Sequence, residues 1–451
     1  MTFRSLSFIG LVTLGLCHTS PARTDQEQRQ PRMPAQPVWH EVITLFGEDT
    51  TKAVINVHYR IGESFFIFVR NERGQQRSEY VARGELVVEL LNEQKISAAR
   101  EIRQISIART SAMKEDGAGP DVVGAISFTV APGTYTVVFG VDDKESGRSF
   151  LDRDKRVTAR TPNLRPLEVS SPVMLQTIQE NLAKPHVNPV NRGGEVVFGG
   201  RGAIFSQILL PDSLTDFKVR WALKGQLDGF GPRSQEFGGS DFVIQNGLPT
   251  VTSKHGSVQY EMLPSASRWA ACIVPLPFEL LEPGLFVLDV EYLGTNVKNT
   301  QTQSFRVTWP GKPFSLANVE LAIDALRHIA SEDEINAMQA GSLMHRAGVF
   351  HEFWKARDPD TMTAYNEVMA EYYYRVDEAL RKFSTVREGD GYRTDRGRIY
   401  ILYGPSPAID RVLRPGSSPM EIWTYEALKK RFVFIDPNKN GIFILSQVEN
   451  L

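Results

Sequence analysis

Over the first two thirds of the chain, hydrophobic residues gather in short runs that alternate with polar and turn residues. Between residues 38 and 165 these runs are rich in Val, Ile, Phe and Tyr, and no helical periodicity interrupts them. Such runs fit a pleated, half-buried surface. Examples of the expected strands are residues 53–59, 65–70, 84–91, 125–130 and 134–141. A β-sandwich is the packing that buries one face of each of these strands.

Residues 166–313 repeat this texture, with expected strands at 195–198, 217–223, 270–274, 286–292 and 302–309. The two stretches share a short sequence pattern: a Pro-Gly turn precedes Tyr135 in the first and Phe286 in the second. An aromatic residue at this place resembles the corner anchor at the start of the penultimate strand in immunoglobulin-like sandwiches. Pro-Gly turns also precede strands in other β proteins. We expect two tandem, all-β, Ig-like sandwich modules, at 38–165 and 166–313.

After residue 313 the hydrophobic period becomes helical. A first helix is expected around residues 319–329, and Ser331 and Glu334 form a capping box that opens a second. A third helix spans about 343–354, and a fourth is expected from Asp358-Pro359 to about Phe383. Strands follow at 398–403, 421–425, 431–436 and 442–448. Residues 314–451 are therefore expected to form an α+β domain of helices followed by a small antiparallel sheet.

The N-terminus has the pattern of a secretory signal peptide. A basic start precedes an apolar run over residues 6–16, and Ser20-Pro21-Ala22 fits a signal peptidase site. Residues 1–22 are therefore expected to be the signal, and the polar, proline-punctuated residues 23–37 a flexible linker. Lipid attachment at Cys17 is disfavoured, because the bulky Leu16 stands where a small residue is expected. We expect an exported protein of the periplasm or cell envelope, or a secreted one.

Charge argues against nucleic-acid binding, and hydropathy argues against a membrane-spanning helix in the mature chain. The 51 basic and 53 acidic residues leave a formal net charge of -2, which provides no field that would attract nucleic acid. The apolar run of the signal is well short of the roughly 20 residues that a membrane-spanning helix needs. No transmembrane segment is expected once the signal has been removed. Cys272 lies in an apolar setting typical of a packed core.

Catalytic and metal-binding motifs give mostly negative results. The chain has no G-x-S-x-G elbow and no P-loop, and His345 and His351 fall on different faces of one helix. Residues 436–441 copy the first half of a calcium loop, but the position of its bidentate ligand falls on the neutral Gln447. An Asn440-Gly441 hairpin turn explains the same residues without an ion. We expect no cofactor and no metal.

One cluster is specific. Gly391, Tyr392, Thr394 and Asp395 sit in the segment Gly-Tyr-Arg-Thr-Asp, which resembles the signature of the GWxTD domain with tyrosine in place of tryptophan. Supporting matches over residues 315–451 are Phe353-Trp354, Asn366, Glu371, Gly404-Pro405, Trp423, Phe432 and Phe434. The resemblance implies a bacterial exported protein with β-rich N-terminal modules, and it implies no reaction.

Two interpretations of this cluster remain open. Thr394 and Asp395 can cap a turn through backbone N–H groups, and Arg396 or Arg398 can hold Asp395, so that the block locks helix to sheet. Alternatively, Arg393, Arg396, Arg398 and Asp395 line a pocket for a partner or an anion. The favoured function is non-catalytic, with a protein partner or assembly in the cell envelope. The alternative is a hydrolase or transferase on envelope polysaccharide or peptide, using acids of the helical domain. Its candidate acids are Glu367, Glu371, Asp377 and Glu378.

Overall fold

The computed structural model describes residues 38–71, 80–110, 121–163, 165, 167–176, 186–187, 189–190, 192–211, 216–229, 232–254, 257–265, 267–385 and 389–451. The predicted signal peptide, the linker and Cys17 lie outside these residues. Two compact units share the described part of the chain: a sandwich unit up to Pro310, and a C-terminal unit from Gly311 that also includes residues 229 and 232. No helix in the described ranges is long and apolar enough to cross a membrane.

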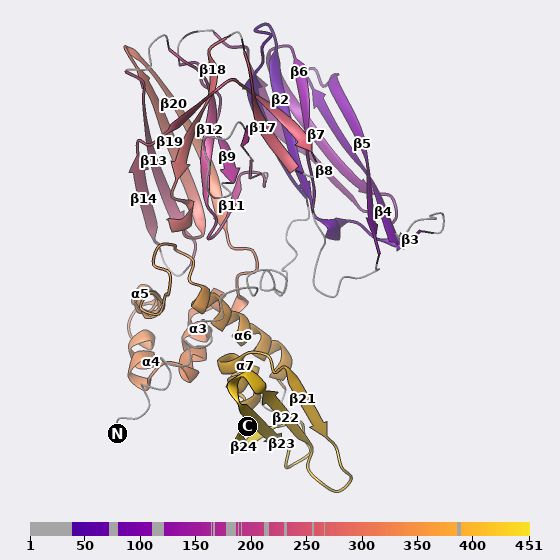
Figure 1. Cartoon of the computed structure of the whole chain (residues 1–451), viewed down its shortest axis with the longest axis vertical. Coiled ribbons are helices and arrows are strands. Elements are labelled where there is room, and N and C mark those ends of the chain that lie inside the picture. The colour runs from indigo at the N-terminus through magenta and orange to yellow at the C-terminus, as the bar shows by residue number, and fades with distance from the viewer. Residues whose placement is uncertain are drawn as a thin grey trace. The chain divides into compact units, whose positions relative to one another are not determined.

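The first module of the sandwich unit is a β-sandwich of antiparallel strands (Figure 1). One sheet has the order β1-β2-β6; in the other, β4 pairs with β3, β5 and β7, and β7 pairs with β8. The strands are β1 (Val38–Phe46), β2 (Ala53–Ile61), β3 (Val69–Arg70), β4 (Tyr80–Leu91), β5 (Ser97–Arg109), β6 (Val122–Val130), β7 (Gly133–Asp143) and β8 (Ser149–Ala159), with a 3-10 turn η1 (Glu63–Phe65).

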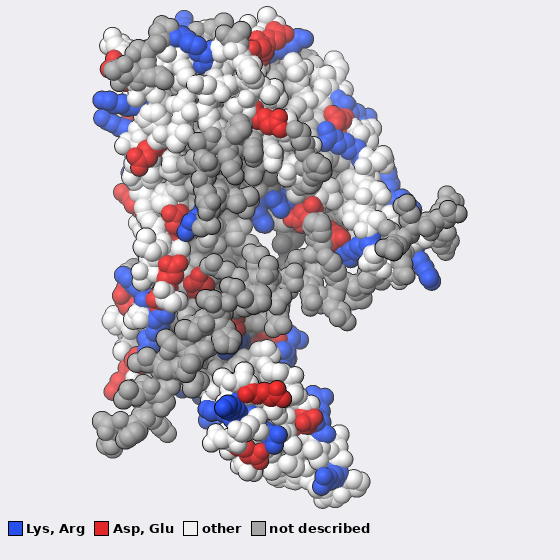
Figure 2. Space-filling model, viewed as in Figure 1, with Lys and Arg blue, Asp and Glu red and all other residues white. Residues whose placement is uncertain are grey.

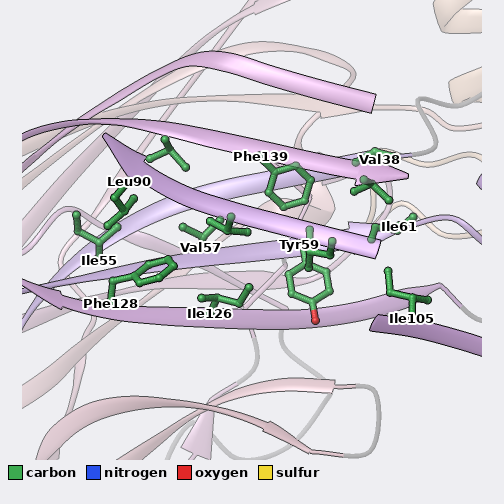
Figure 3. Close-up of a cluster of buried hydrophobic side chains, with 14 of the residues drawn as sticks. Val38, Ile55, Val57, Tyr59, Ile61, Leu90, Ile105, Ile126, Phe128 and Phe139 are labelled. Carbon is green, nitrogen blue, oxygen red and sulfur yellow. The ribbon is translucent and has the colours of Figure 1, made fainter. Parts of the chain in front are cut away.

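Alternate residues of each strand build the core of this module, as the period of two requires. On β2, Ile55, Val57 and Tyr59 point between the sheets, where they meet Leu90 and Phe139 from the opposite sheet (Figure 3). Full burial of an aliphatic or aromatic side chain of this kind contributes about 1.5–3 kcal/mol. The predicted strand at 65–70 is mostly a 3-10 turn and loop, with only the last two residues in β3.

The aromatic anchor predicted at the start of the penultimate strand is present in the first module. The Tyr135 hydroxyl donates to the Ala131 carbonyl oxygen at 2.8 Å, which is the geometry of a tyrosine corner. In the second module Phe286 has no hydroxyl and instead stacks on Phe305, with ring centroids 5.6 Å apart. Gly225 makes room for the Phe286 ring, because a Cβ there would collide with it.

The second module has the strand order of an immunoglobulin-like sandwich. Its sheets have the orders β9-β12-β18-β15 and β11-β20-β19-β13-β14, which reproduce the A-B-E-D and C-F-G arrangements. A further small sheet, β10-β17-β16, contains the β16–β17 hairpin. The strands are β9 (Val173–Gln176), β10 (His186–Val187), β11 (Glu195–Val197), β12 (Gly202–Leu209), β13 (Lys218–Leu227), β14 (Ser234–Gly239), β15 (Val243–Asn246), β16 (Leu248–Lys254), β17 (Ser257–Leu263), β18 (Trp269–Leu276), β19 (Gly284–Gly294) and β20 (Val297–Thr308), with a 3-10 turn η2 (Phe278–Leu280).

The C-terminal unit consists of helices packed on one face of the sheet β21-β22-β23-β24 (Figure 1). Its helices are η3 (Phe314–Ala317), α3 (Val319–Ala325), η4 (Leu326–His328), α4 (Glu332–Gln339), α5 (Leu343–Lys355), α6 (Glu367–Phe383), η5 (Gly391–Arg393), α7 (Asp395–Tyr403) and η6 (Glu426–Leu428). Its strands are β21 (Ala408–Val412), β22 (Met420–Tyr425), β23 (Lys430–Ile435) and β24 (Ile444–Asn450).

Helix α6 is the centre of this unit. Its buried stripe includes Tyr372 and Tyr373, whose hydroxyls donate to the Ala325 and Ala322 carbonyl oxygens at the end of α3. At its other end, the Phe383 ring lies 5.7 Å from the Trp423 ring of β22. The helix therefore connects the helical layer to the sheet, as its apolar spacing predicted.

In this unit one predicted element has the wrong type, one predicted helix boundary is wrong, and one cap is confirmed. The expected strand at 398–403 is helix α7, because Thr394 caps the N-terminus of that helix and accepts a hydrogen bond from Gly397 N at 3.0 Å. The expected helix start at Asp358-Pro359 is non-helical, and α6 begins instead after the N-cap Asn366. The Ser331–Glu334 capping box is formed as predicted. Strand β21 was not predicted.

Candidate functional site

The two glycines of the motif segment allow backbones to approach more closely than any other residue would. A Cβ on Gly391 would collide with the Ala379 carbonyl oxygen of α6, and a Cβ on Gly397 would collide with the Gly391 carbonyl oxygen. The Gly391 amide also donates to the Ser384 hydroxyl at 2.8 Å. Turn η5 and helix α7 are thus fitted against the end of α6 by backbone contact, which explains glycine at these positions.

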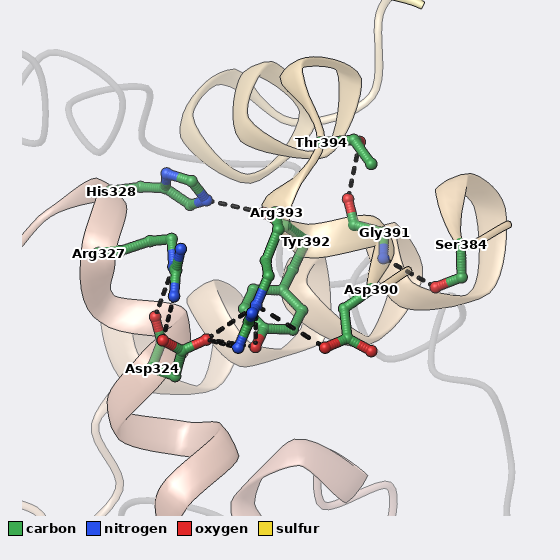
Figure 4. A network of polar contacts seen from close by, with 9 residues as sticks. All are labelled: Asp324, Arg327, His328, Ser384, Asp390, Gly391, Tyr392, Arg393 and Thr394. Atoms are coloured by element: carbon green, nitrogen blue, oxygen red, sulfur yellow. Dashed lines mark hydrogen bonds and ion pairs between the residues drawn. The ribbon is translucent and has the colours of Figure 1, made fainter. Parts of the chain in front are cut away.

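Tyr392 lies in a polar network beneath this turn (Figure 4). Its ring is 1% exposed, and its hydroxyl donates to the Asp324 carboxylate of α3. Two arginines, Arg327 and Arg393, pair with the same carboxylate. Burial raises the pKa of Tyr392 to about 12, and the hydrogen bond to Asp324 acts in the same direction.

Asp324 is ionised in this network. Its burial acts to raise the pKa, but hydrogen bonds from Tyr392 and Arg327 outweigh that effect and hold the pKa of Asp324 below its ordinary value. His328 lies beside it, with Nε2 2.8 Å from the Tyr392 carbonyl oxygen. Because that oxygen can only accept, Nε2 carries the proton. Burial lowers the pKa of His328, so its ring is neutral near pH 7.

Thr394 and Asp395 make the backbone caps that the sequence predicted. The Thr394 hydroxyl donates to the Gly391 carbonyl oxygen at 2.8 Å and accepts from Gly397 N, so it closes η5 and opens α7. Asp395 Oδ2 accepts from the Leu445 amide of β24 at 2.8 Å, and its Oδ1 lies 3.1 Å from Arg398. The pair fixes the start of α7 to the last strand of the sheet.

Arg396 points in a different direction from Arg398. Its guanidinium lies 3.6 Å from Glu421 of β22 and 4.3 Å above the Phe443 ring, and its side chain is 12% exposed. It also donates to the Gly441 carbonyl oxygen at 3.4 Å. This cation–π and ion-pair contact holds the loop between β23 and β24 against α7.

The three motif arginines therefore do not converge on a common anion. Arg393 is paired with Asp324 at 2.8 Å, Arg396 with Glu421, and Arg398 with Asp395. Each cation has an internal carboxylate partner, which satisfies its charge within the unit. The arrangement supports the locking interpretation of the cluster more than an anion pocket.

An open groove lies beside the contacts that Asp395 and Arg396 make with the sheet. Its volume is about 340 Å³, and it is lined by Arg393, Thr394, Asp395, Ile442, Phe443 and Ile444. We call this the motif groove. One wall is apolar and comes from the residues that lead into β24, and the rim carries one arginine and one aspartate. Ile444 is 48% exposed, so the apolar wall faces solvent.

The acids of α6, considered for catalysis, are engaged in other contacts. Asp377 accepts from the backbone amides of Phe314 and Ser315 at 2.7 and 3.1 Å, and burial raises its pKa. Glu378 is paired with Arg381 and Lys382, and Glu371 with Arg375. Asp377 ties α6 to η3, whereas the pairs of Glu378 and Glu371 lie within α6 itself. These contacts give no specific support to a pair of acids converging on a substrate.

The half calcium loop at 436–441 closes on itself. The Asp436 carboxylate accepts from the amides of Asn440 and Gly441 at 3.1 and 2.7 Å, and Gly441 has a φ of 89°. This is the hairpin-turn explanation, with a short polar side chain satisfying the turn amides. Within the described ranges, no group of three or more His, Cys, Asp or Glu side chains could hold a metal ion.

Sequence reasoning missed Asp324 and Glu421, the acids that receive the motif arginines. Neither belongs to a local motif, and both approach the cluster only through tertiary packing. A supporting residue of the resemblance, Asn366, does have a visible role: it caps α6 and donates to the Trp354 carbonyl oxygen at 2.8 Å.

Comparisons with known proteins add little outside the C-terminal region. No curated protein matches the chain. An ICAM-5 ectodomain fragment is similar at 14% identity, with 62% of this chain and 54% of that chain covered and a TM-score of 0.13. The N-terminal domain of a Streptococcus gordonii adhesin is similar at 10% identity, with 57% and 60% covered and a TM-score of 0.15. Similarities at such scores carry no argument about fold or function.

A third solved structure, the vertebrate-specific, perforin-like membrane protein Astrotactin-2, is 10% identical over 93% of this chain and 90% of that chain, with a TM-score of 0.19. It too supports no inference. The comparison with protein families gives a match in the C-terminal region. The matched segment contains helices α3 to α7, the motif cluster and the first three strands of the small sheet. Residues 291–443, in the C-terminal region of this chain, match the model of the GWxTD domain.

Proposed function

We propose that this chain is an exported, non-catalytic protein of the cell envelope that binds a protein partner through the motif groove. The supporting observation is the shape and chemistry of that groove: it is open, apolar on one wall and charged at its rim. Protein interfaces combine these features, with an apolar centre and a polar border. Small ligands are usually bound in concave pockets that enclose most of their surface.

The lock beneath the groove explains how its walls are held. Asp395 fixes Leu445 at the start of β24, and Arg396 clamps Phe443 from below. Asp395 and Arg396 already make these contacts within the unit. Neither side chain therefore needs to contact the partner. In this proposal the motif preorganises a binding surface, which lowers the ordering cost of association.

The envelope setting rests on the sequence. It is supported by the signal-peptide pattern of residues 1–22 and by the resemblance of the motif segment to a family of bacterial exported proteins. Nearly balanced charge is consistent with a protein partner and gives no attraction to nucleic acid.

Partner capture from the envelope fraction tests the proposal. The tagged full chain is crosslinked gently in its own envelope fraction, purified, and compared with Ile444→Glu and Val448→Glu. Both positions lie on β24 and are about equally exposed, at 48% and 51%, but only Ile444 lines the groove. We expect one protein to be recovered with the wild type and with Val448→Glu, and to be lost with Ile444→Glu.

Two outcomes would overturn the proposal. One is recovery of the chain alone at moderate salt; the other is equal loss of the partner with both variants while both unfold at the wild-type temperature. The hydrolase alternative would then be tested with a polysaccharide and peptide substrate screen.

A further inference from the structure

The two sandwich modules share a buried contact that the sequence did not predict. The outer face of the sheet β1-β2-β6 packs on the second module, where Ile43 and Leu45 of β1 join Phe205, Tyr260 and Ile273 in one apolar cluster. At the edge of this contact, the fully buried Gln207 side chain bonds both the amide and the carbonyl of Phe46, at 2.7 and 2.8 Å. We call this contact the joint.

Polar, titratable groups lie within this apolar joint. Glu41 of β1, which is half-buried, stands directly opposite His58 of β2 in the register of the sheet. The His58 ring is 0% exposed, and its Nε2 lies 2.8 Å from the hydroxyl of Tyr260, which the β16–β17 hairpin supplies from the second module. His58 Nδ1 is buried and finds no hydrogen-bond partner among the described residues. Buried polar groups of this kind are costly unless they are satisfied.

Burial disfavours the charged form of each of these three groups. It lowers the pKa of His58 to about 3 and raises the pKa of Tyr260 well above its ordinary value. It also raises the pKa of Glu41 to about 7, against an opposing effect of Lys155. A carboxyl that titrates near neutrality thus belongs to the cross-strand neighbour of His58, and its charge acts on Tyr260.

Charged groups lie on several elements around the joint, among them Glu261, which follows Tyr260 on β17. Lys155 lies on β8, and Arg60 of β2 is paired with Asp121 at 2.9 Å. From the second module, the Arg192 guanidinium lies 5.7 Å over the Trp39 ring, and Glu195 acts on its charge. Of these groups, Lys155 is the one that acts on the Glu41 carboxyl.

We propose that the joint is a proton-controlled contact between the two modules, which is tight while the Glu41 carboxyl is protonated and loosens when it ionises. The closed joint disfavours the carboxylate, because ionisation places a charge beside the neutral His58 ring and the Tyr260 hydroxyl. In the open state water solvates the same carboxylate. Protons therefore bind more tightly to the closed form, and a rise in pH favours opening.

The expected size follows from the difference between the ordinary and the closed-state pKa of Glu41, 4.5 and about 7. Between these values the closing equilibrium weakens about tenfold per pH unit, so that the total change is on the order of 100-fold. Above the closed-state pKa the dependence levels off. The apolar cluster keeps the closed form dominant, and the pH changes how often the joint opens.

Thiol labelling of the chain without its predicted signal, residues 1–22, measures this opening directly, because Cys17 is then absent. Ile43→Cys places a thiol in the joint, while Cys272, 0% exposed and pointing away from the joint into the core of the second module, reports unfolding of that module. Labelling rates at about pH 5, 6, 7 and 8 are divided by the rate of the unfolded chain at the same pH. The comparison uses Ile43→Cys alone, with Glu41→Gln, and with Glu93→Gln, which alters an exposed carboxylate in the turn after β4.

In the parent and in the Glu93→Gln control, we expect protection of the introduced thiol to fall on the order of 100-fold from about pH 5 to about pH 8, while Cys272 stays protected. With Glu41→Gln, protection should stay constant within about twofold. A pH-independent parent, or a Glu41→Gln variant that follows the parent, would overturn the proposal. If Ile43→Cys disturbs the joint, hydrogen exchange of the backbone amides of β17 in the unsubstituted chain measures the same opening. The protection of these amides should fall in the same way from about pH 5 to about pH 8.

Discussion

The Asp395 carboxylate accepts a 2.8 Å hydrogen bond from the backbone amide of Leu445, 50 residues later in the chain. One oxygen of the motif aspartate thus satisfies an amide of the edge strand β24, and the other faces Arg398. An unpaired edge amide is a site where another strand can add. The motif aspartate therefore fixes α7 to the sheet and caps part of its edge.

Removing that carboxylate should destabilise the C-terminal unit. We expect Asp395→Ala to lower its free energy of unfolding by about 1–3 kcal/mol, because the Leu445 amide loses its acceptor. Asp395→Asn keeps an acceptor oxygen and should cost less. Calorimetry of the full chain measures the transition of this unit, with Asp410→Ala on the exposed strand β21 as the control.

The same variant separates the two interpretations of the cluster. If Asp395→Ala lowers the melting temperature and leaves partner capture intact in the folded state, the motif is a structural lock and Asp395 makes no contact with the partner. Loss of capture without any thermal effect would instead place Asp395 in the binding surface.

The contact between Tyr392 and Asp324 should be worth more than a neutral hydrogen bond, since the acceptor is ionised. We expect Tyr392→Phe to cost about 1.5–3 kcal/mol of unfolding free energy. A double-mutant cycle with Asp324→Asn should give a coupling energy of about 0.5–3 kcal/mol. Additive effects of the two substitutions would show that Arg327 and Arg393 hold Asp324 without the tyrosine.

Most strands expected in the sandwich modules are present, because their alternation is local. Ile55, Val57 and Tyr59 repeat with period two, and this pattern alone determines which residues face the core. The tyrosine corner at Tyr135 was predictable for the same reason, since the turn and the aromatic residue are adjacent in sequence.

Prediction failed where long-range packing decides the structure. Residues 399–403 are an apolar run that fits a strand or a buried helix equally well, and the Thr394 cap together with close backbone contact selects the helix. The network under the motif joins residues 68 positions apart, Tyr392 and Asp324. No periodicity in a single sequence indicates such a pair, and the same holds for His58 and Tyr260 at the joint.

Acid should weaken the C-terminal unit through Asp324. Its folded pKa lies below the ordinary value of 3.8, so the folded unit releases this proton more readily than the unfolded chain. The resulting stability is present above the ordinary pKa and is lost as the pH falls through the folded pKa. From about pH 5 to about pH 2.5, the melting temperature of this unit should fall more steeply in the wild type than in Asp324→Asn. Equal slopes would show that other carboxylates, such as Glu378, govern the acid transition.

Close backbone contact at Gly391 gives the sharpest steric prediction. The three atoms nearest to a methyl group there are backbone atoms, from Ala379, Phe383 and Ser384, and none of these can move like a flexible side chain. We expect Gly391→Ala to lower the unfolding free energy of the C-terminal unit by about 3 kcal/mol or more. The matched control is Gly348→Ala in α5, where a Cβ would meet nothing within 4 Å. That variant should stabilise the unit by about 0.5–1 kcal/mol, because alanine loses less backbone freedom on folding than glycine. Denaturant titration of both variants measures the difference, and a Gly391→Ala variant as stable as the wild type would contradict the close fit of η5 on α6.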